Sequence, residues 1–426
     1  MKHANSRMPS QWSCLDNAAK IFPSNSRKRD TKVFRFVCEL HEPVNAQILQ
    51  EALDQTMEVF PGYQSILKRG LFWYYLETCS IKPVVRMESR SPCGPLYDKN
   101  AKNLLFDVTY YRNRINVEVY HALSDGTGVL QFLRVLVYHY LTRAHADIFG
   151  ENPPLMDYDA SIEEKMDDSF QRYYSRAKKS GIGKRRRAYR LKGAKVPEHR
   201  IKVIEGVFPV KQMLALAHEY HTTLTVLVAA VFLRSIHGEM AVRAKKRPVV
   251  LTVPVNLRNF FDSESARNFF STINVGYNFE KNSSELPDVI REVNRSFQEQ
   301  LTPENMEGRL NLLASFEHNV LARVAPLVLK DVVLRIAHDV SAMENTGALS
   351  NIGKIDMPSE FDPYIRLFDV FVSTNKLQIC MCSFRDNLTV SFTSPFVSSA
   401  IQKRFFRTFT DLGIPVEIAT NSMDDE

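Results

Sequence analysis

The chain has 426 residues, of which 44% are hydrophobic and 24% are charged. A single hydrophobic core stops growing at roughly 250–300 residues, so this length predicts two lobes. Glycine and proline are too few, at 16 and 20 residues, for a fibrous or disordered chain. The formal net charge of +7 favours anionic partners and falls short of the basicity that indicates nucleic acid.

The sequence also bears on the compartment. None of the cysteines forms a CxxC pair, which favours a reducing compartment and predicts a cytoplasmic protein. Residues 1–30 are polar and lack the apolar segment of a signal peptide. The longest apolar run, residues 224–233, is about ten residues long and too short to span a bilayer. We therefore expect a soluble chain with, at most, peripheral membrane contact.

Strand and helix patterns alternate in the first third of the chain. Residues 33–41 predict a strand, and apolar spacing over residues 46–60 predicts a helix that Pro61 and Gly62 end. Residues 71–77 predict another strand. A regular alternation over residues 114–120 predicts a half-buried strand that runs directly into His121, and residues 129–141 predict an apolar helix.

A basic segment follows at residues 176–202, where twelve Lys or Arg residues accompany one acid, Glu198. We interpret it as a crossover between an N-terminal lobe, residues 1–175, and a C-terminal lobe, residues 203–426. It could bind the phosphates of coenzyme A, an acidic carrier protein or an anionic membrane, or it could be a solvated linker. The cations concerned are Lys178, Lys179, Lys184, Arg185, Arg186, Arg187, Arg190, Lys192 and Lys195.

The second half opens with the same strand–helix order as the first. Strands are predicted at residues 203–210, 248–254, 367–374, 377–384, 388–393 and 416–419. Helices are predicted at residues 211–220, 223–236 and 399–412, with Gly413 capping the last. This order predicts an α+β fold with two similar lobes.

The segment from Tyr120 to Gly128 carries the chemistry. A strand end is a rigid mount for His121, whose ordinary pKa suits proton abstraction near neutral pH. Gly126 can adopt a positive φ, and Asp125 or Thr127 can cap the next helix. The imidazole would then lie near a helix N-terminus, which favours developing negative charge. A structural histidine before an ordinary turn remains the alternative.

The run His121-Ala-Leu-Ser-Asp125-Gly126 resembles the HxxxDG signature of the condensation-domain and alcohol acetyltransferase-like superfamily, which has chloramphenicol acetyltransferase-type folds. The layout of the whole chain is similar to that group as well. Its other matching elements are Leu15-Asp16-Asn17-Ala18-Ala19, the Pro-x-x-x-Arg segment from Pro254 to Arg258, and Ser350-Asn351-Ile352-Gly353.

This resemblance implies two chloramphenicol acetyltransferase-like lobes, each a mixed sheet flanked by helices, with an active-site tunnel between them. It implies transfer of an acyl group from acyl-CoA or an acyl carrier protein to an alcohol, with His121 as general base and no covalent acyl-enzyme. Acyl-CoA is then a co-substrate rather than a resident cofactor, and a monomer suffices. Two alternatives remain: an amine acceptor, or a non-catalytic member that binds acyl chains or carrier proteins.

The resemblance also assigns roles to other residues. Asp125 would be structural and pair with Arg258, and Gly126 would support the turn. Tyr120, Ser124 and Asn351 could line the site. Condensation domains usually show two successive histidines, and Tyr120 stands in place of the first, which is not the base. The DFGWG element of plant members is absent.

A metal site is not expected. His218 and His221 are three residues apart, but no Cys or acidic cluster completes the set of ligands.

Overall fold

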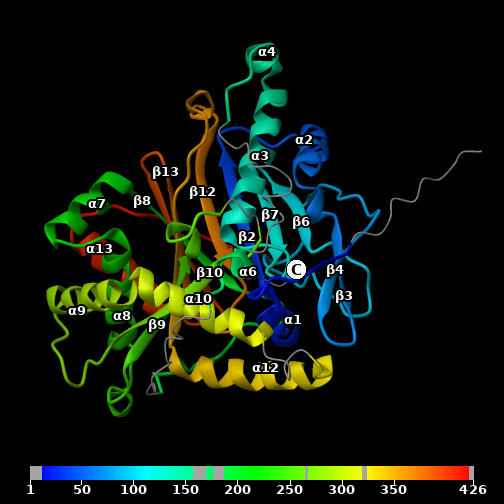
Figure 1. Cartoon of the computed structure of the whole chain (residues 1–426). Helices are drawn as coiled ribbons and strands as arrows, with labels where there is room; N and C mark the ends of the chain where they lie inside the picture. Colours follow the sequence, from blue (N-terminus) through cyan, green and yellow to red (C-terminus); the bar gives the residue numbers. More distant parts are fainter. Residues whose placement is uncertain (1–11, 157–168, 176–186, 264–266, 319–323, 422–426) are drawn as a thin grey trace, which may run out of the picture.

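The computed structural model describes residues 12–156, 169–175, 187–263, 267–318 and 324–421, and Figure 1 shows their arrangement. The first large sheet has the order β12-β2-β7-β6-β5. Its strands are β12 (Ile365–Val372), β2 (Val33–Leu40), β7 (Arg114–Tyr120), β6 (Phe106–Tyr111) and β5 (Arg86–Met87). Helices α2 (Ala46–Val59) and α3 (Gly126–Ala144) pack together, and α3 lies against β2 and β7.

The second large sheet has the order β10-β9-β11-β13-β14-β8-β15. Its strands are β10 (Phe270–Tyr277), β9 (Val249–Asn256), β11 (Gly347–Lys354), β13 (Leu377–Phe384), β14 (Asn387–Ser394), β8 (Lys202–Pro209) and β15 (Glu417–Thr420). The helices near it are α7 (Val210–Glu219), α8 (Leu224–Gly238), α9 (Leu286–Gln300) and α13 (Ala400–Asp411).

A small third sheet, β1-β4-β3, lies beside the first lobe and consists of Trp12–Cys14, Tyr74–Thr78 and Ser65–Arg69. The remaining helices are α1 (Phe22–Asn25), α4 (Ala146–Phe149), α6 (Ser169–Tyr173), α10 (Pro303–His318) and α12 (Leu327–Ser341). Within the described ranges no single helix has the length and apolarity to cross a membrane; α7 and α8 meet that criterion only as a pair bent by 82°.

Both large sheets are mixed. Strand β11 runs parallel to β9 and β13, and β5 runs parallel to β6, whereas the other pairs in the two sheets are antiparallel. The buried apolar side chains form two clusters, one around each large sheet. The predicted fold class, two mixed-sheet lobes flanked by helices, is confirmed.

One strand crosses between the lobes. Strand β12 follows β11 of the second sheet in the chain, yet it pairs with β2 at the edge of the first sheet. Four residues later β13 is back in the second sheet. The segment predicted as the C-terminal lobe, residues 203–426, therefore supplies an edge strand to the other lobe, and this crossing was not expected.

The predicted elements agree closely with the structure where the apolar pattern is regular. Strands β7 and β13 occupy their predicted residues. Helix α3 begins at Gly126, three residues before the predicted start, because Asp125 caps it there. The sequence analysis did not predict β3, β6, β10, β11, α9, α10 or α12. Helix α9 carried a detectable signal, since Leu286, Val289, Ile290, Val293 and Phe297 all face the core.

The predicted basic crossover is only partly within the described residues; Lys178, Lys179, Lys184, Arg185 and Arg186 lie outside them. The described part, residues 187–202, is attached to the second lobe by backbone hydrogen bonds. The amides of Ala188 and Tyr189 donate to the carbonyls of Met343 and Pro248, at 3.0 and 2.8 Å.

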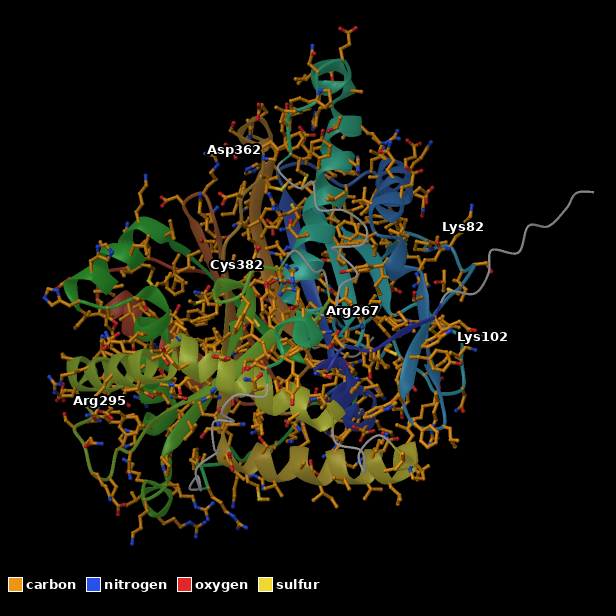
Figure 2. All side chains as sticks on the ribbon, in the orientation of Figure 1. Lys82, Lys102, Arg267, Arg295, Asp362 and Cys382 are labelled. Atoms are coloured by element: carbon orange, nitrogen blue, oxygen red, sulfur yellow. The ribbon has the colours of Figure 1, made fainter. Side chains whose placement is uncertain are left out.

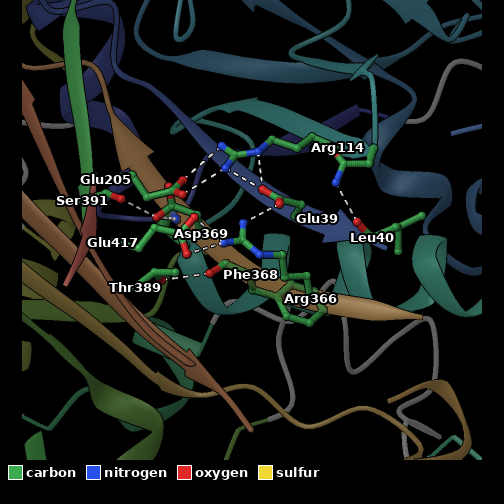
Figure 3. Close-up of polar contacts among 12 residues, drawn as sticks. Glu39, Leu40, Arg114, Glu205, Arg366, Phe368, Asp369, Thr389, Ser391 and Glu417 are labelled. Carbon is green, nitrogen blue, oxygen red and sulfur yellow. Dashed lines mark hydrogen bonds and ion pairs between the residues drawn. The ribbon is translucent and has the colours of Figure 1, made fainter. Parts of the chain in front are cut away.

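A buried charge network joins the two large sheets, as Figure 3 shows. Arg114 of β7 donates to Glu39 of β2 at 2.6 Å and, with both terminal nitrogens, to Glu205 of β8 at 2.9 and 3.0 Å. Arg366 of β12 also binds Glu39. Burial, followed by the nearby Glu205 carboxylate, raises the pKa of Asp369 well above its usual range. The network therefore fixes how the two sheets face one another.

Replacing Arg114 by Met should destabilise the fold by about 3–5 kcal/mol, because it leaves Glu205 buried without its cation. Arg86→Met is the matched control. Arg86 belongs to the same sheet but forms an exposed ion pair with Asp107, and such pairs contribute roughly 0–1 kcal/mol. Urea denaturation of both variants measures the difference in the free energy of unfolding. Equal losses in the two variants would show that the network does not stabilise the fold.

Candidate active site

The end of β7 holds His121 at the seam between the lobes. The backbone N–H of His121 donates to the carbonyl of Lys32 at 2.8 Å. The imidazole stacks on Phe22, with ring centroids 4.6 Å apart, and packs against Phe34 at 4.5 Å. Phe270, from the second lobe, lies at 5.8 Å. Aromatic rings from both lobes therefore surround the imidazole, and the residue is only partly exposed.

Two buried polar residues orient the imidazole. Asn268 Oδ1 lies 3.3 Å from His121 Nδ1. The amide nitrogen of the same side chain, Nδ2, donates to Asp16 Oδ2 at 3.1 Å, and the backbone N–H of Asn268 donates there at 3.2 Å. Because Nδ2 is engaged by the carboxylate, only the carbonyl oxygen of Asn268 faces the imidazole. This contact favours the tautomer with the proton on Nδ1 and the lone pair on Nε2.

The surroundings keep this imidazole neutral. Burial lowers the pKa of His121 to about 4. The hydrogen bond to Asn268 and the Asp125 carboxylate act in the opposite direction, and Lys32 adds to the lowering. Above about pH 5, His121 is thus an unprotonated base.

Asp125 does not contact the imidazole in this arrangement; it joins the lobes. One oxygen, Oδ1, accepts from the backbone N–H of Gly128 at 3.0 Å and caps α3. The other, Oδ2, accepts from Arg258 Nη1 and from the backbone N–H of Phe269, both at 2.8 Å. Of the two capping residues that the sequence allowed, Asp125 is therefore the one that caps, and the expected contact between Asp125 and Arg258 is present.

Arg258 is held on its own side by the second lobe. Its Nη1 also donates to Asn256 Oδ1 at 3.2 Å, and its Nη2 donates to the carbonyl of Arg267 at 2.6 Å. Asn256 in turn donates to Thr127 Oγ1 at 3.3 Å. Figure 2 labels Arg267 near the middle of the molecule, where its guanidinium lies 3.9 Å from Asp16.

Gly126 differs from the expectation. It does not adopt a positive φ, since it is the first residue of α3. A Cβ at this position would lie 3.4 Å from Ile352 Cδ1, an ordinary van der Waals contact, so neither φ nor lack of space requires glycine here.

Asn351 braces a turn in β11. Its Oδ1 accepts from the backbone N–H of Gly353, whose φ is +90°, and its Nδ2 donates to Thr225, both at 2.8 Å. The element Ser350-Asn351-Ile352-Gly353 thus meets the HxxxDG segment through Ile352, while both hydrogen bonds of Asn351 lie within the second lobe.

The other two candidate lining residues are fully buried. Tyr120 stacks on Tyr97, and its hydroxyl is 2.8 Å from Ser26 Oγ. Ser124 Oγ lies 3.4 Å from the carbonyl of Asp125.

Sequence analysis missed Asn268 altogether. Asp16 appeared only as part of a motif with no assigned role. No periodic pattern marks residues 267–269, and the meaning of Asp16 emerges only when a segment 252 residues away lies against it.

A cavity of about 380 Å³ is lined by four cations, Arg27, Arg190, Lys195 and Lys376, and by Asp339, which pairs with Arg27. Burial, reinforced by Arg190 and Lys32, lowers the pKa of Lys376 to about 8. Two cations of the predicted crossover, Arg190 and Lys195, thus converge with two cations that the sequence did not connect to it. Such a cluster suits phosphate groups.

Asp125→Ala should destabilise the protein by about 3–5 kcal/mol, since it removes a helix cap and leaves Arg258 without its carboxylate. Thr223→Ala, which removes only the cap of α8, should cost about 1 kcal/mol. Chemical denaturation compares the two variants. A loss for Asp125→Ala no larger than that for Thr223→Ala would contradict the role of the ion pair.

No known family model matches this sequence, and no curated protein is significantly similar to it. Solved structures, by contrast, match nearly the whole chain. F. graminearum TRI101 complexed with coenzyme A and T-2 mycotoxin has a TM-score of 0.63 and 12% identity, over 96% of this chain and 100% of that one. The first condensation domain of the CDA synthetase gives a TM-score of 0.61 and 15% identity, over 96% and 97%. TRI3 trichothecene 15-O-acetyltransferase from Fusarium sporotrichioides gives 0.59 and 12%, over 96% of each chain. The chain therefore has the two-lobed fold that condensation domains share with these acetyltransferases.

Proposed function

We propose that this chain is an acyltransferase that moves an acyl group from a thioester, acyl-CoA or an acyl carrier protein, to an alcohol, with His121 as the general base. One observation carries the proposal: Asn268, itself held by Asp16, places its side-chain oxygen 3.3 Å from Nδ1 of His121, an arrangement that favours the tautomer with the lone pair on Nε2.

In this mechanism Nε2 takes the proton of the acceptor hydroxyl. The oxygen attacks the thioester carbonyl and forms a tetrahedral oxyanion. As the intermediate collapses, the C–S bond breaks and the thiolate receives the proton from the imidazolium, so the free thiol and the ester leave. No covalent acyl-enzyme intermediate forms at any stage. The N-terminus of α3, four to five residues after His121, favours the developing negative charge.

The supports for a thioester donor are chemical and structural. The cavity lined by Arg27, Arg190, Lys195 and Lys376 offers cations for the phosphates of coenzyme A. A TRI101 structure with the same fold contains coenzyme A together with an acceptor, T-2 mycotoxin. We propose acyl-CoA as co-substrate, a monomeric working unit and a cytoplasmic location. An amine acceptor, or acyl binding without turnover, are the alternatives that activity measurements separate.

His121→Ala should lower kcat/KM by about 10²–10⁴, the usual contribution of a positioned general base. The assay offers a panel of acyl-CoAs with alcohols and with amines, and follows release of free thiol. His218→Ala is the matched control, because His218 is exposed on α7 in the other lobe. If folded His121→Ala released thiol as fast as the parent, the assignment of the base would be wrong. Thiol release with amines alone would identify an N-acyltransferase, and none with any pair would favour a binding protein.

The acid limb of the pH dependence of kcat/KM should fall near pH 4 instead of near pH 6.5. The folded-state pKa of His121 lies below its ordinary value because burial disfavours the imidazolium, so the base stays neutral down to that pH. By linkage, the neutral form's contribution to stability is complete above about pH 6.5 and declines as the pH falls toward 4. Initial rates from pH 4 to pH 8 check this prediction. A limb centred at pH 6–7 would indicate a solvated imidazole instead.

A further inference from the structure

Helix α12 (Leu327–Ser341) has its apolar side turned away from the protein. In Figure 1 it runs along the lower edge of the molecule. Six large apolar side chains on this helix are each at least half exposed: Val328, Leu329, Val332, Val333, Ile336 and Val340. Their spacing of three and four residues places them on one face.

The charged residues of α12 attach it to the protein. Lys330 Nζ donates to the carbonyl of Phe72 at 2.9 Å and lies 3.4 Å from the centre of the Trp73 ring. Asp331 accepts from the hydroxyl of Tyr74 at 3.0 Å. Asp339 forms an ion pair with Arg27 at 2.7 Å. These contacts fix the rotation of the helix, so its apolar face is held outward by specific bonds.

The loop before β4 extends the same apolar surface. The backbone N–H of Leu327 donates to the carbonyl of Leu71 at 2.9 Å, which places the two segments side by side. Leu71 and Phe72 are 73% and 41% exposed. Monomeric soluble proteins rarely expose a continuous apolar patch of this kind, and one rimmed by polar residues marks an interaction site.

Cations gather at the C-terminal end of the helix. Arg27 binds Asp339 there, and the amide of Ala188 donates to Met343, which brings the described part of the basic crossover to this end. Five basic residues lie on these segments: Arg27, Lys28, Arg187, Arg190 and Lys195. Three acids lie at the same end: Asp339 and Glu198 form ion pairs with Arg27 and Lys28, and Glu344 follows the helix. The cations there outnumber the acids, which favours an anionic partner over a second copy of the same surface.

We propose that the face of α12, with Leu71 and Phe72, docks onto the surface of an anionic lipid bilayer. The apolar side chains enter the boundary between head groups and acyl chains, and the cations at the end of the helix meet the lipid phosphates and carboxylates. This places the protein on a membrane without crossing it. The proposal shares Arg27, Arg190 and Lys195 with the cavity proposed for coenzyme A, whereas the apolar face tested below contains no residue assigned to acyl transfer.

The test is flotation of the full chain with two kinds of vesicle, pure phosphatidylcholine and phosphatidylcholine with 30% phosphatidylserine. We expect binding to the anionic vesicles that weakens as salt is raised, and much less binding to the neutral ones. Val333→Asp with Ile336→Asp should lower the partition coefficient at least about tenfold, since two carboxylates replace inserted side chains. Leu155→Asp is the matched control, because Leu155 is 96% exposed next to the C-terminal half of α3.

Melting temperatures of the variants show whether they are folded. Binding that is equal in the parent and the double variant would overturn the proposal, as would failure to bind vesicles of either composition. Sedimentation analysis tests whether a second copy of the chain occupies this face instead. If the parent were a dimer and the double variant a monomer, the face would be a dimer interface and the proposal would be overturned. Thiol release with a water-soluble substrate pair is measured separately, so loss of membrane binding and loss of the proposed activity are distinguishable.

Discussion

The ion pair between Asp125 and Arg258 is the contact on which the arrangement of the site depends. It joins the first turn of α3 to the segment after β9, and the backbone N–H of Phe269 adds a second bond to the same carboxylate oxygen. Residues 267–269 take part in three of the hydrogen bonds that hold the site. Arg267 accepts from Arg258, Asn268 holds the imidazole, and Phe269 holds Asp125. The histidine and the aspartate of the motif are thus both positioned by one short segment of the opposite lobe, residues 267–269.

This arrangement separates architecture from chemistry. Asp125 uses both oxygens for a helix cap and an inter-lobe pair, so its direct bonds go to structure. The role of orienting the imidazole falls to Asn268, supported by Asp16. A neutral amide in that position favours one tautomer without raising the pKa of the base as strongly as a carboxylate would. The proposed base is therefore oriented and neutral over the whole physiological pH range.

The lobes are held together at a second place as well. The buried network around Arg114 and Glu205 ties β7 to β8, and β12 crosses from one lobe to pair with β2 in the other. Helix α12 contacts α1 and the loop that contains Leu71, and its apolar face lies at the outer surface. The exposed side chains proposed to enter a membrane are therefore different residues from those that surround His121.

The sequence by itself determined the elements with a regular apolar period, such as β7 and β13, because alternation is a local property. It also indicated the HxxxDG segment. The family resemblance over the whole chain indicated Arg258 as the partner of Asp125. The irregular segment at residues 267–269, the crossing of β12 and the outward face of α12 were decided only by tertiary structure. Each of these depends on which distant segment lies alongside, and neither spacing nor composition encodes that choice. Asn268 illustrates the point, since it becomes part of the candidate site only because folding brings it between Asp16 and His121.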